Sequence, residues 1–537
     1  MLIDVSMMRG EIPRFKAHLL PNEAATYALD CEFTHGVLTP MKQNAMADNL
    51  PLSPRSLFRY GDHWLVWSGS AEVSAISSPQ ARDPYQRVYF TGEGKPKVTA
   101  QDIAIGPNGV GPQAAYDLGV PKPSSAPLIV AIDASTGESP PEGEAAAFDD
   151  ETRFYVQTYV TRFGEEGIPS NPSQELLVER PGSTVTVRIT SPTTNTHNIT
   201  HIRLYRTSTS LTDEAYLLVD EVPISQSTIV DAARDATGPV VETWDYALPP
   251  ENLQGLCQMA NGICAGFSGN EILFSDAYLP YAWPKRNRAT TEHEIVAITA
   301  IGTSLVVGTK GYPYLFSGIT PDAMTATKIE REQACVSARS MVVINGVVFY
   351  ASPDGIVAIG SDGAIPATES IIDPVTWRAR WTPESLSAVS VEGLYVAQSE
   401  GGSFVFDPVS MAFTRTTDTW DASFTDLEND RLVMVNGRQL LHWRQGEQHR
   451  PLVWRSKAFL VPKDALLSSA RIQTDHPERL SLRFLADGEE VFTVAMGSLT
   501  HDAFRLPCVR ATYWQVEVSG TADVDRILLA SSMQELA

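Results

Sequence analysis

Short apolar runs that alternate with polar residues, separated by Gly, Asp and Pro turns, make up most of this chain. Alternation with a period of two predicts half-buried β-strands. Four such runs near the N-terminus have the pattern of one antiparallel meander. They lie at residues 56–60, 64–68, 73–77 and 88–91. A Pro-punctuated arm at residues 10–21 and a short helical pattern at residues 23–29 precede them.

A turn signal recurs along the second half of the chain, between residues 250 and 456. The turns are centred on Gly262, Gly302, Gly346, Gly393 and Asp430, at spacings of 40, 44, 47 and 37 residues. Each turn lies between two apolar runs, as residues 340–344 and 347–350 do around Gly346. Units of about 40–50 residues with four strands apiece are typical of β-propellers. With the N-terminal meander, the five units predict about six blades.

A Pro/Ser-rich linker at residues 120–127 precedes a different β pattern. Its strand-like runs lie at residues 154–160, 184–189, 202–207, 215–222 and 228–231. This close spacing is typical of a β-sandwich. The phrases Tyr159-Val-x-x-Phe-Gly-Glu-Glu-x-x-Pro-Ser170 and Arg203-Leu-Tyr-Arg206 make the stretch resemble a fibronectin type III domain.

These patterns together predict an all-β chain: a β-propeller with an inserted fibronectin type III-like sandwich and a C-terminal β domain. Residues 1–120 would supply an N-terminal arm and the first propeller strands. Residues 121–250 would form the sandwich and residues 251–456 the propeller blades. Residues 457–537 have their own alternation and would form a β domain that caps the propeller or partly completes it.

Length and charge narrow the class of protein. A chain of 537 residues is long enough for two to four domains. Its 64 acidic and 41 basic residues give a formal charge of −23. This argues against a general nucleic-acid coat, because a protein that grips phosphates needs a basic surface. An acidic surface suits solubility, or a conduit along which DNA slides without binding.

The cysteines and the N-terminal residues indicate the cellular compartment in which the chain is made. Five scattered cysteines without a C-x-x-C pair indicate neither a disulfide framework nor a zinc ribbon. We expect buried thiols made in a reducing cytoplasm; the cysteines are Cys31, Cys257, Cys264, Cys335 and Cys508. The first ten residues lack the pattern of a signal peptide, and no apolar run is long enough to predict a membrane span.

Several motifs could carry chemistry, but each has a simpler structural explanation. His197 and His201 have the spacing of two zinc ligands on a helix, yet they lie in a Thr-rich β context and lack the catalytic Glu. The glycine-rich loop at residues 106–111 lacks the Lys-Ser/Thr of a phosphate-binding loop. Asn198-Ile-Thr200 matches a glycosylation acceptor, which means nothing without a secretory signal.

Evidence for an enzyme is equally weak. Residues 352–355, Ser-Pro-Asp-Gly, predict a hairpin turn rather than a calcium ligand or an active site. There is no G-x-S-x-G elbow and no repeated Asp box. The tryptophans could form a sugar-binding platform, although blade cores use them more often. They include Trp64, Trp67, Trp283, Trp377, Trp381, Trp420, Trp443, Trp454 and Trp514. We therefore predict no catalytic residue, no cofactor and no metal site.

Several phrases in order along the chain resemble the nozzle, or tail tubular, proteins of short-tailed bacteriophages. The resemblance covers nearly the whole chain and rests on the order of the phrases. They are Arg9-Gly-Glu-Ile-Pro-Arg14, Gly36-Val-Leu-Thr-Pro40, Asn270-Glu-Ile-Leu-Phe-Ser-Asp276, Pro280-Tyr-Ala-Trp-Pro284, Thr309-Lys-Gly-Tyr-Pro-Tyr-Leu-Phe-Ser-Gly318, Gln333-Ala-Cys-Val-Ser-Ala-Arg339, Tyr350-Ala-Ser-Pro-Asp-Gly-Ile356, Ser456-Lys457 and Phe504-Arg-Leu-Pro507.

The resemblance implies a non-enzymatic virion protein that is made in the host cytoplasm and ends in the viral tail. Such proteins form a ring, usually a homo-hexamer, beneath a portal and adaptor. DNA passes through the lumen during ejection, and fibres or spikes attach outside. Three alternatives stay open: another phage tail hub or receptor-binding protein, a propeller hydrolase acting on host surface polysaccharide, and a propeller scaffold for cellular proteins.

Overall fold

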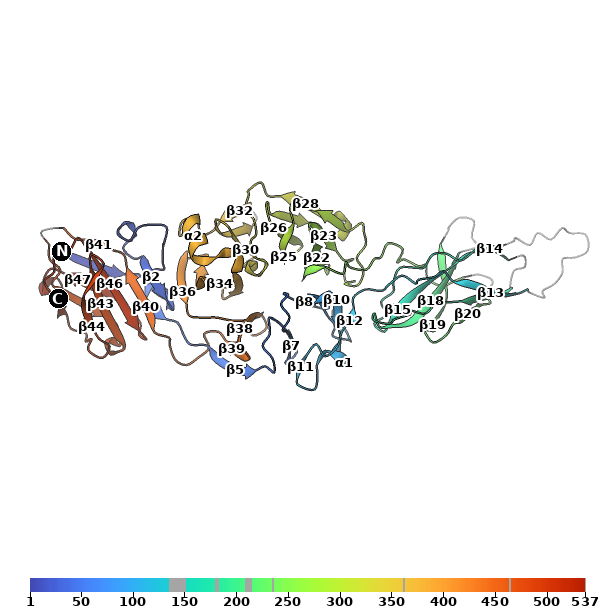
Figure 1. Cartoon of the computed structure of the whole chain (residues 1–537), viewed down its shortest axis with the longest axis horizontal. Coiled ribbons are helices and arrows are strands. Elements are labelled where there is room, and N and C mark those ends of the chain that lie inside the picture. Colours follow the sequence, from blue (N-terminus) through green and yellow to red (C-terminus); the bar gives the residue numbers. More distant parts are fainter. Residues whose placement is uncertain are drawn as a thin grey trace, which may run out of the picture.

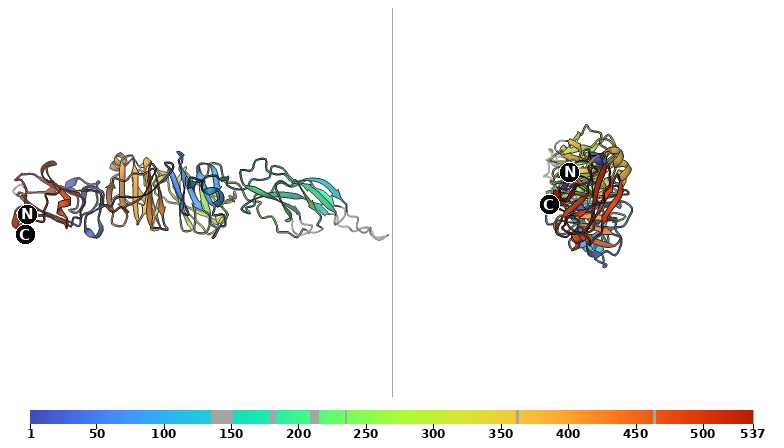
Figure 2. Two further views of the ribbon diagram at one scale, coloured as in Figure 1. Left: turned by 90° about the horizontal axis from the view of Figure 1, so that it is seen from below. Right: turned by 90° about the vertical axis from the view of Figure 1, so that its left-hand side faces the viewer.

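The computed structural model describes residues 1–134, 151–178, 183–207, 215–233, 236–360, 363–462 and 465–536. It is nearly all β, with 46% strand and 7% helix, so the all-β prediction is confirmed. The molecule is elongated: both termini lie at one end, and strands β13 to β20 lie at the other (Figures 1 and 2).

Four consecutive sheets repeat one design, in which four strands pair antiparallel in chain order. The first contains β21 (Gln254–Gln258), β22 (Cys264–Ser268), β23 (Glu271–Phe274) and β24 (Arg288–Thr290). The second contains β25 (Ile295–Ile301), β26 (Ser304–Thr309), β27 (Tyr314–Ser317) and β28 (Thr325–Lys328). The third contains β29 (Val342–Ile344), β30 (Val347–Ser352), β31 (Gly355–Gly360) and β32 (Gly363–Pro366). The fourth contains β33 (Ser387–Val391), β34 (Leu394–Ser399), β35 (Gly402–Asp407) and β36 (Ala412–Thr416).

A fifth sheet of this kind is completed by a strand from the N-terminal arm. Strands β37 (Ala422–Asp426), β38 (Arg431–Asn436) and β39 (Gln439–His442) pair in order, and β39 then pairs with β5 (Ala45–Asn49). A strand from the N-terminal part of the chain therefore shares a sheet with strands from residues 422–442.

The meander expected at residues 56–91 is two sheets instead of one. β6 (Ser56–Tyr60) and β7 (His63–Trp67) pair with β11 (Val110–Gly111). β8 (Ser74–Ser77), β9 (Val88–Gly92), β10 (Gly94–Thr99) and β12 (Tyr116–Asp117) form the other sheet. The prediction of one sheet was wrong because β11 occupies the free edge of β7, where β8 would have paired.

These seven sheets follow one another in a circular order. Their first strands contact each other in the sequence β6, β37, β33, β29, β25, β21 and β8. The circle is completed by contact between its first and last sheets, which contain β7 and β9, respectively. These two sheets share a core that contains Leu65, Trp67, Val88 and Phe90. Apolar residues between the sheets thus hold the first strands around a common centre.

The predicted turns all join the first and second strands of a sheet, as the five hairpin registers confirm. Their central residues have positive φ, for example 78° at Gly346 and 47° at Asp430. Glycine adopts this left-handed conformation without steric cost. For this reason the turns could be predicted from the sequence.

The chain between β12 and β21 forms the far end of the molecule (Figure 1). One sheet contains β13 (Leu128–Asp133), β17 (Thr184–Arg188) and β20 (Thr228–Asp231). A second contains β15 (Tyr155–Thr161), β18 (Ile199–Thr207) and β19 (Tyr216–Pro223), and β14 (Glu151–Arg153) pairs with β16 (Leu176–Val178). A single apolar core draws residues from both larger sheets, including Val187, Ile202 and Ile229. We call this part the inserted body.

The two chain termini build the opposite end together. β1 (Leu2–Ser6), β47 (Arg526–Ala530), β42 (Ser469–Gln473) and β45 (Phe504–Arg505) form one sheet. The other contains β2 (Ala25–Leu29), β40 (Leu452–Ser456), β46 (Tyr513–Gly520), β43 (Leu480–Ala486) and β44 (Glu489–Val494), with β41 (Phe459–Leu460) on β46. A common core that includes Trp454 and Trp514 lies between them. We call this part the terminal body.

Two expectations about the N-terminal arm need correction. The helical pattern at residues 23–29 is strand β2, because the backbone of Tyr27 to Leu29 pairs with β40. Strands β1 and β2 lie on either side of this arm and belong to the terminal body, and the short pair β3 (Cys31–Glu32) and β4 (Thr39–Pro40) follows β2. The described residues contain two α-helices: α1 (Gln101–Ala104) is a single turn, and α2 (Pro374–Trp381) is capped by the Asp373 carboxylate.

Candidate functional site

The first strands of the circular array enclose an opening with a volume of about 580 Å³. Its wall is built by β6, β25, β29, β33 and β37, together with the segments that precede them. Most of the lining is small or apolar. The ionisable lining residues are Arg55, Glu72, Arg339 and Asp421.

Three of the four ionisable groups of this opening contact other groups of the protein. Arg339 Nε lies 3.3 Å from Glu72 Oε2. Desolvation raises the pKa of Glu72, and Arg339 acts against this rise. Asp421 Oδ2 accepts a hydrogen bond of 2.7 Å from the backbone N–H of Gly437. Glu72 thus keeps a raised pKa beside its arginine partner, whereas Asp421 is held by a backbone N–H.

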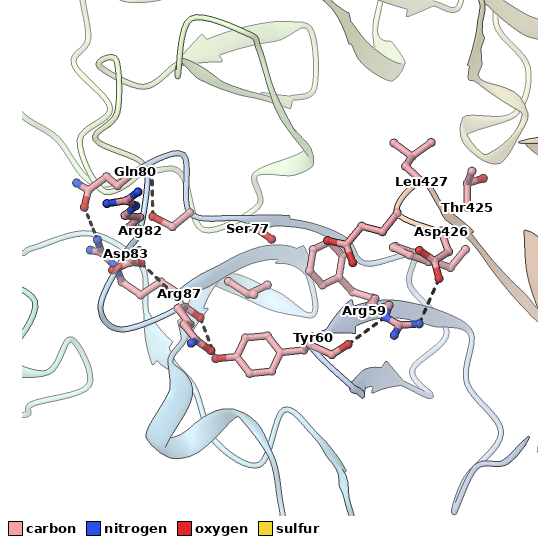
Figure 3. A pocket seen from close by; sticks show the side chains of 17 residues that line it. Arg59, Tyr60, Ser77, Gln80, Arg82, Asp83, Arg87, Thr425, Asp426 and Leu427 are labelled. Carbon is pink, nitrogen blue, oxygen red and sulfur yellow. Dashed lines mark hydrogen bonds and ion pairs between the residues drawn. The ribbon is translucent and has the colours of Figure 1, made fainter. Parts of the chain in front are cut away.

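A second pocket, with a volume of about 560 Å³, lies between β6, the segment 77–88 and the end of β37 (Figure 3). Arg59 Nη1 reaches Asp426 Oδ2 at 3.2 Å on one side. On the other side Arg87 donates to Asp83 and Gln80, each at 2.7 Å. These polar side chains satisfy one another, so the pocket has the character of a structural cleft.

Arg87 also links the circular array to the inserted body. Its Nη1 lies 2.6 Å from Glu165 Oε1, and its guanidinium lies 5.3 Å from the ring centre of Phe163. Burial raises the pKa of Glu165 to about 7, although the charge of Arg87 acts in the opposite direction. A further bond, from Tyr85 Oη to the backbone oxygen of Arg162, measures 3.0 Å. A buried ion pair of this kind fixes the orientation of the two parts.

A comparable ion cluster joins the array to the terminal body. Arg450 Nη2 lies 2.7 Å from Asp418 Oδ1, and Arg450 Nη1 lies 3.3 Å from Asp30 Oδ1. The Asp418 carboxylate also accepts from Trp443 Nε1 at 2.8 Å. Burial would raise the pKa of Asp418, but Arg450 and the other donors hold it below its usual value. Glu11 is likewise buried and pairs with Arg415 Nε at 2.8 Å.

The two histidines of the sequence motif make separate contacts. His197 Nδ1 lies 2.9 Å from the backbone oxygen of Gly119, while His201 Nδ1 lies 3.0 Å from the hydroxyl of Thr200. They lie before and within strand β18, as the β context indicated, and not on a helix. Among the described residues no group of three or more His, Cys, Asp and Glu could hold a metal ion.

The glycine-rich loop and the Ser-Pro-Asp-Gly motif have structural roles. A Cβ at Gly111 would collide with the backbone oxygen of Ala104, which explains that glycine by packing. Ser352 and Gly355 pair directly across the β30–β31 hairpin, as the turn prediction required. The Ser352 hydroxyl donates to Gln333 at 2.9 Å, so it is not a free nucleophile. The Asn198-Ile-Thr200 motif spans the start of β18, which begins at Ile199.

The nine tryptophans named from the sequence do not make an exposed platform, whereas the tenth, Trp244, is 42% exposed. Of the nine considered, eight are buried and Trp64 is half-buried. The cysteine expectation needs one correction: Cys508 is exposed, whereas the other four are buried or half-buried free thiols. Burial raises the pKa of Cys335 to about 12, which makes this thiol unreactive.

The ion clusters at the two junctions could not be found from the sequence. Asp30 and Arg450 are separated by most of the chain, and no local motif announces either residue. These residues come together through the pairing of β2 with β40, and that pairing is known only from the fold.

Among the described residues, no helix has the length and apolar character needed to cross a bilayer. No family model and no curated protein matches the chain. Structural neighbours have low TM-scores. One is the extracellular domain of what is described as a hybrid two-component system of B. thetaiotaomicron, with 9% identity, TM-score 0.26, and coverage of 93% of this chain and 61% of that one.

A second neighbour is PorZ, a bacterial surface component of the type-IX secretion system of Porphyromonas gingivalis. It has 10% identity, a TM-score of 0.28, and coverage of 91% of this chain and 61% of that one. An exo-β-1,3-galactanase of Phanerochaete chrysosporium has 8% identity and a TM-score of 0.19, and covers 91% of this chain and 99% of that one. The chain thus spans about three fifths of the first two, and likenesses this weak assign neither family nor activity.

Proposed function

We propose that this chain is a structural protein of a bacteriophage tail, the nozzle through which DNA leaves the virion. In this proposal the seven-sheet array is a β-propeller, the inserted body is a fibronectin type III-like sandwich, and the terminal body is a C-terminal β domain. Copies would assemble as a ring, a homo-hexamer, beneath the portal and adaptor. Fibres or spikes would attach to its outer surface.

The observation that carries the proposal is the rod-like order of three β bodies with buried ion pairs at both junctions. Arg87 with Glu165 links one pair of bodies, and Arg450 with Asp30 and Asp418 links the other. Such junctions resist hinge motion, because breaking a buried pair leaves an uncompensated charge. A rigid rod suits a wall segment of a tube that is loaded by passing DNA.

Charge supports the same role. A formal charge of −23 would make a wall that repels DNA phosphates, provided that the acidic side chains face the lumen of the assembled ring. An electrostatic map of the ring tests this point: a lumen lined by Lys and Arg would contradict it.

The proposal excludes an enzymatic role for the central opening. Glu72 and Asp421, the carboxylates that line it among the described residues, are engaged by Arg339 and by a backbone N–H. We expect no release of reducing sugars when the protein is incubated with host envelope polysaccharide. Release that is lost in the Glu72→Gln variant would favour the hydrolase instead.

The assembly itself is tested by native mass measurement of the purified protein, alone and mixed with a candidate portal–adaptor complex. We expect a species that carries several copies of the chain on one connector. A monodisperse monomer that never joins the connector would contradict the nozzle role.

A further inference from the structure

A basic pocket lies where the chain passes twice between the circular array and the inserted body. Its volume is about 490 Å³, within the range of small-ligand sites. Four segments line it: the outgoing linker, a loop of the inserted body, the returning segment 244–248, and the loop between β23 and β24. The lining residues are Lys122, Ile168, Trp244, Asp245, Tyr246, Ala247, Leu248, Lys285 and Arg286.

The charge of this pocket is opposite to that of the chain. Three cations and one carboxylate line it, whereas the whole protein carries a formal charge of −23. Arg286 is compensated, because its Nη1 lies 2.8 Å from Asp245 and its Nη2 lies 3.5 Å from Asp276. The two lysines form no ion pair with a described residue, although Asp276, Glu242 and Glu166 act electrostatically on Tyr246 in the same wall. Lys122 donates to the neutral amide oxygen of Asn171 at 2.8 Å, and Lys285 has no hydrogen-bond or ion-pair partner among the described residues.

Aromatic and aliphatic side chains form the rest of the wall. Trp244 keeps 42% of its surface exposed, although it contacts Tyr216 edge to face at 5.3 Å. Leu248 is 39% exposed, and Tyr246 packs against Tyr281 at 6.1 Å. Apolar faces beside cations that form no ion pair with a described residue fit a ligand that has both a ring and a negative charge.

The wall is held in place by hydrogen bonds to backbone oxygens. The Thr243 hydroxyl donates to the Gly167 oxygen at 2.7 Å, which ties the returning segment to the residue before Ile168. The N–H of Trp283 donates to the Ala247 oxygen at 3.1 Å, which ties the same segment to the β23–β24 loop. The pocket therefore exists before any ligand arrives, and binding would cost little ordering.

We propose that this pocket binds a compact anionic sugar, namely a pyranose that carries a carboxylate or a phosphate group. Lys122 and Lys285 would neutralise the anion, and Trp244 would cover one face of the sugar ring. A compact ligand fits better than an extended peptide, because segment 244–248 contains no strand whose edge could pair with a peptide backbone. The inference goes beyond the tail role and does not depend on it.

The test is isothermal titration of the full-length protein with three probes: a glucuronic acid oligosaccharide, a neutral glucose oligosaccharide of the same length, and glucose 1-phosphate. We expect binding of the uronate, the sugar phosphate or both, and none of the neutral sugar. Whichever probe binds identifies the anion. Affinity should fall as salt rises, because the lysines lie at an exposed rim.

Variants locate the site. Lys285→Gln and Trp244→Ala should each weaken binding about tenfold or more, the effect of losing one charge-assisted contact or one ring contact. Lys16→Gln removes one exposed lysine near the terminal body and should leave binding unchanged. Equal binding of the neutral sugar, unchanged affinity in Lys285→Gln, or no binding of either sugar anion would overturn the proposal.

Discussion

At the scale of single residues, buried arginines favour one orientation of the neighbouring bodies over others. Arg450 is 8% exposed and contacts the carboxylates of Asp30 and Asp418 at the boundary between the array and the terminal body. Desolvating these groups costs as much as their attraction returns, so the cluster adds little net stability. Its value is that a wrong orientation of the two bodies would bury charges without partners.

Removing the central arginine should therefore be costly. Arg450→Met leaves Asp30 and Asp418 buried without their cation, and we expect a loss of about 3–5 kcal/mol in the free energy of unfolding, measured by urea denaturation. Arg479→Met is the matched control, because Arg479 has 58% side-chain exposure and should change the free energy by less than about 0.5 kcal/mol. Equal midpoints for the two variants would refute the role of the cluster.

The pH dependence of the other junction follows from Glu165. Its pKa in the folded protein is raised to about 7 from an ordinary 4.5. The folded state therefore holds this proton more tightly than the unfolded chain, and the contribution of Glu165 to stability falls as pH rises from about 4.5 to about 7. Glu165→Gln keeps a hydrogen bond to Arg87 and removes the titration. Thermal unfolding across this pH range should give a flatter profile for the variant, and identical slopes would contradict the assignment.

At the scale of elements, the pairing of β5 with β39 closes the circular array. Asn49 and Gln439 lie directly opposite each other, and both are exposed. Directly opposed residues of an antiparallel pair have Cβ atoms about 4.5–5.5 Å apart, close enough for engineered cysteines to cross-link with slight adjustment.

Cross-linking tests this closure. In a Cys508→Ser background, which removes the exposed native thiol, Asn49→Cys with Gln439→Cys should form a disulfide on mild oxidation. The product is detected by a changed mobility on non-reducing gels and by the loss of two titratable thiols. The two single-cysteine variants are the controls and should stay reduced. Failure of the double variant to cross-link would mean that the N-terminal strand does not close the array.

Local signals explain which elements could be predicted from the sequence. Gly262, Gly302 and Gly346 lie at hairpin turns with positive φ, which glycine adopts most easily. The repeat could therefore be recognised in the sequence. The pairings of β1, β2 and β5 could not be predicted from the sequence. The partner of a short strand is determined by tertiary contacts, and here the partner strands are far away in the sequence. For the same reason the ion clusters of Glu11 and Arg450 could not be predicted from the sequence, whereas the histidine and glycine motifs are visible there and lie in a strand and a loop.

At the scale of the whole molecule, three β bodies follow one another along a rod (Figure 2). The terminal body shares a sheet with the array, because β2 pairs in parallel with β36. The inserted body is attached by two chain passages and by the Arg87–Glu165 pair. In the proposed nozzle, the Leu29–Arg415 strand pairing and the buried ion pairs would provide the stiffness that a tube wall requires.

Electron microscopy of the protein bound to a portal–adaptor complex is the most direct test of this account. We predict a ring of identical rods extending the connector, with a continuous lumen, and with the seven-sheet array at the same height in every copy. Single copies attached irregularly, or no density beyond the adaptor, would contradict the proposal that this chain forms the nozzle.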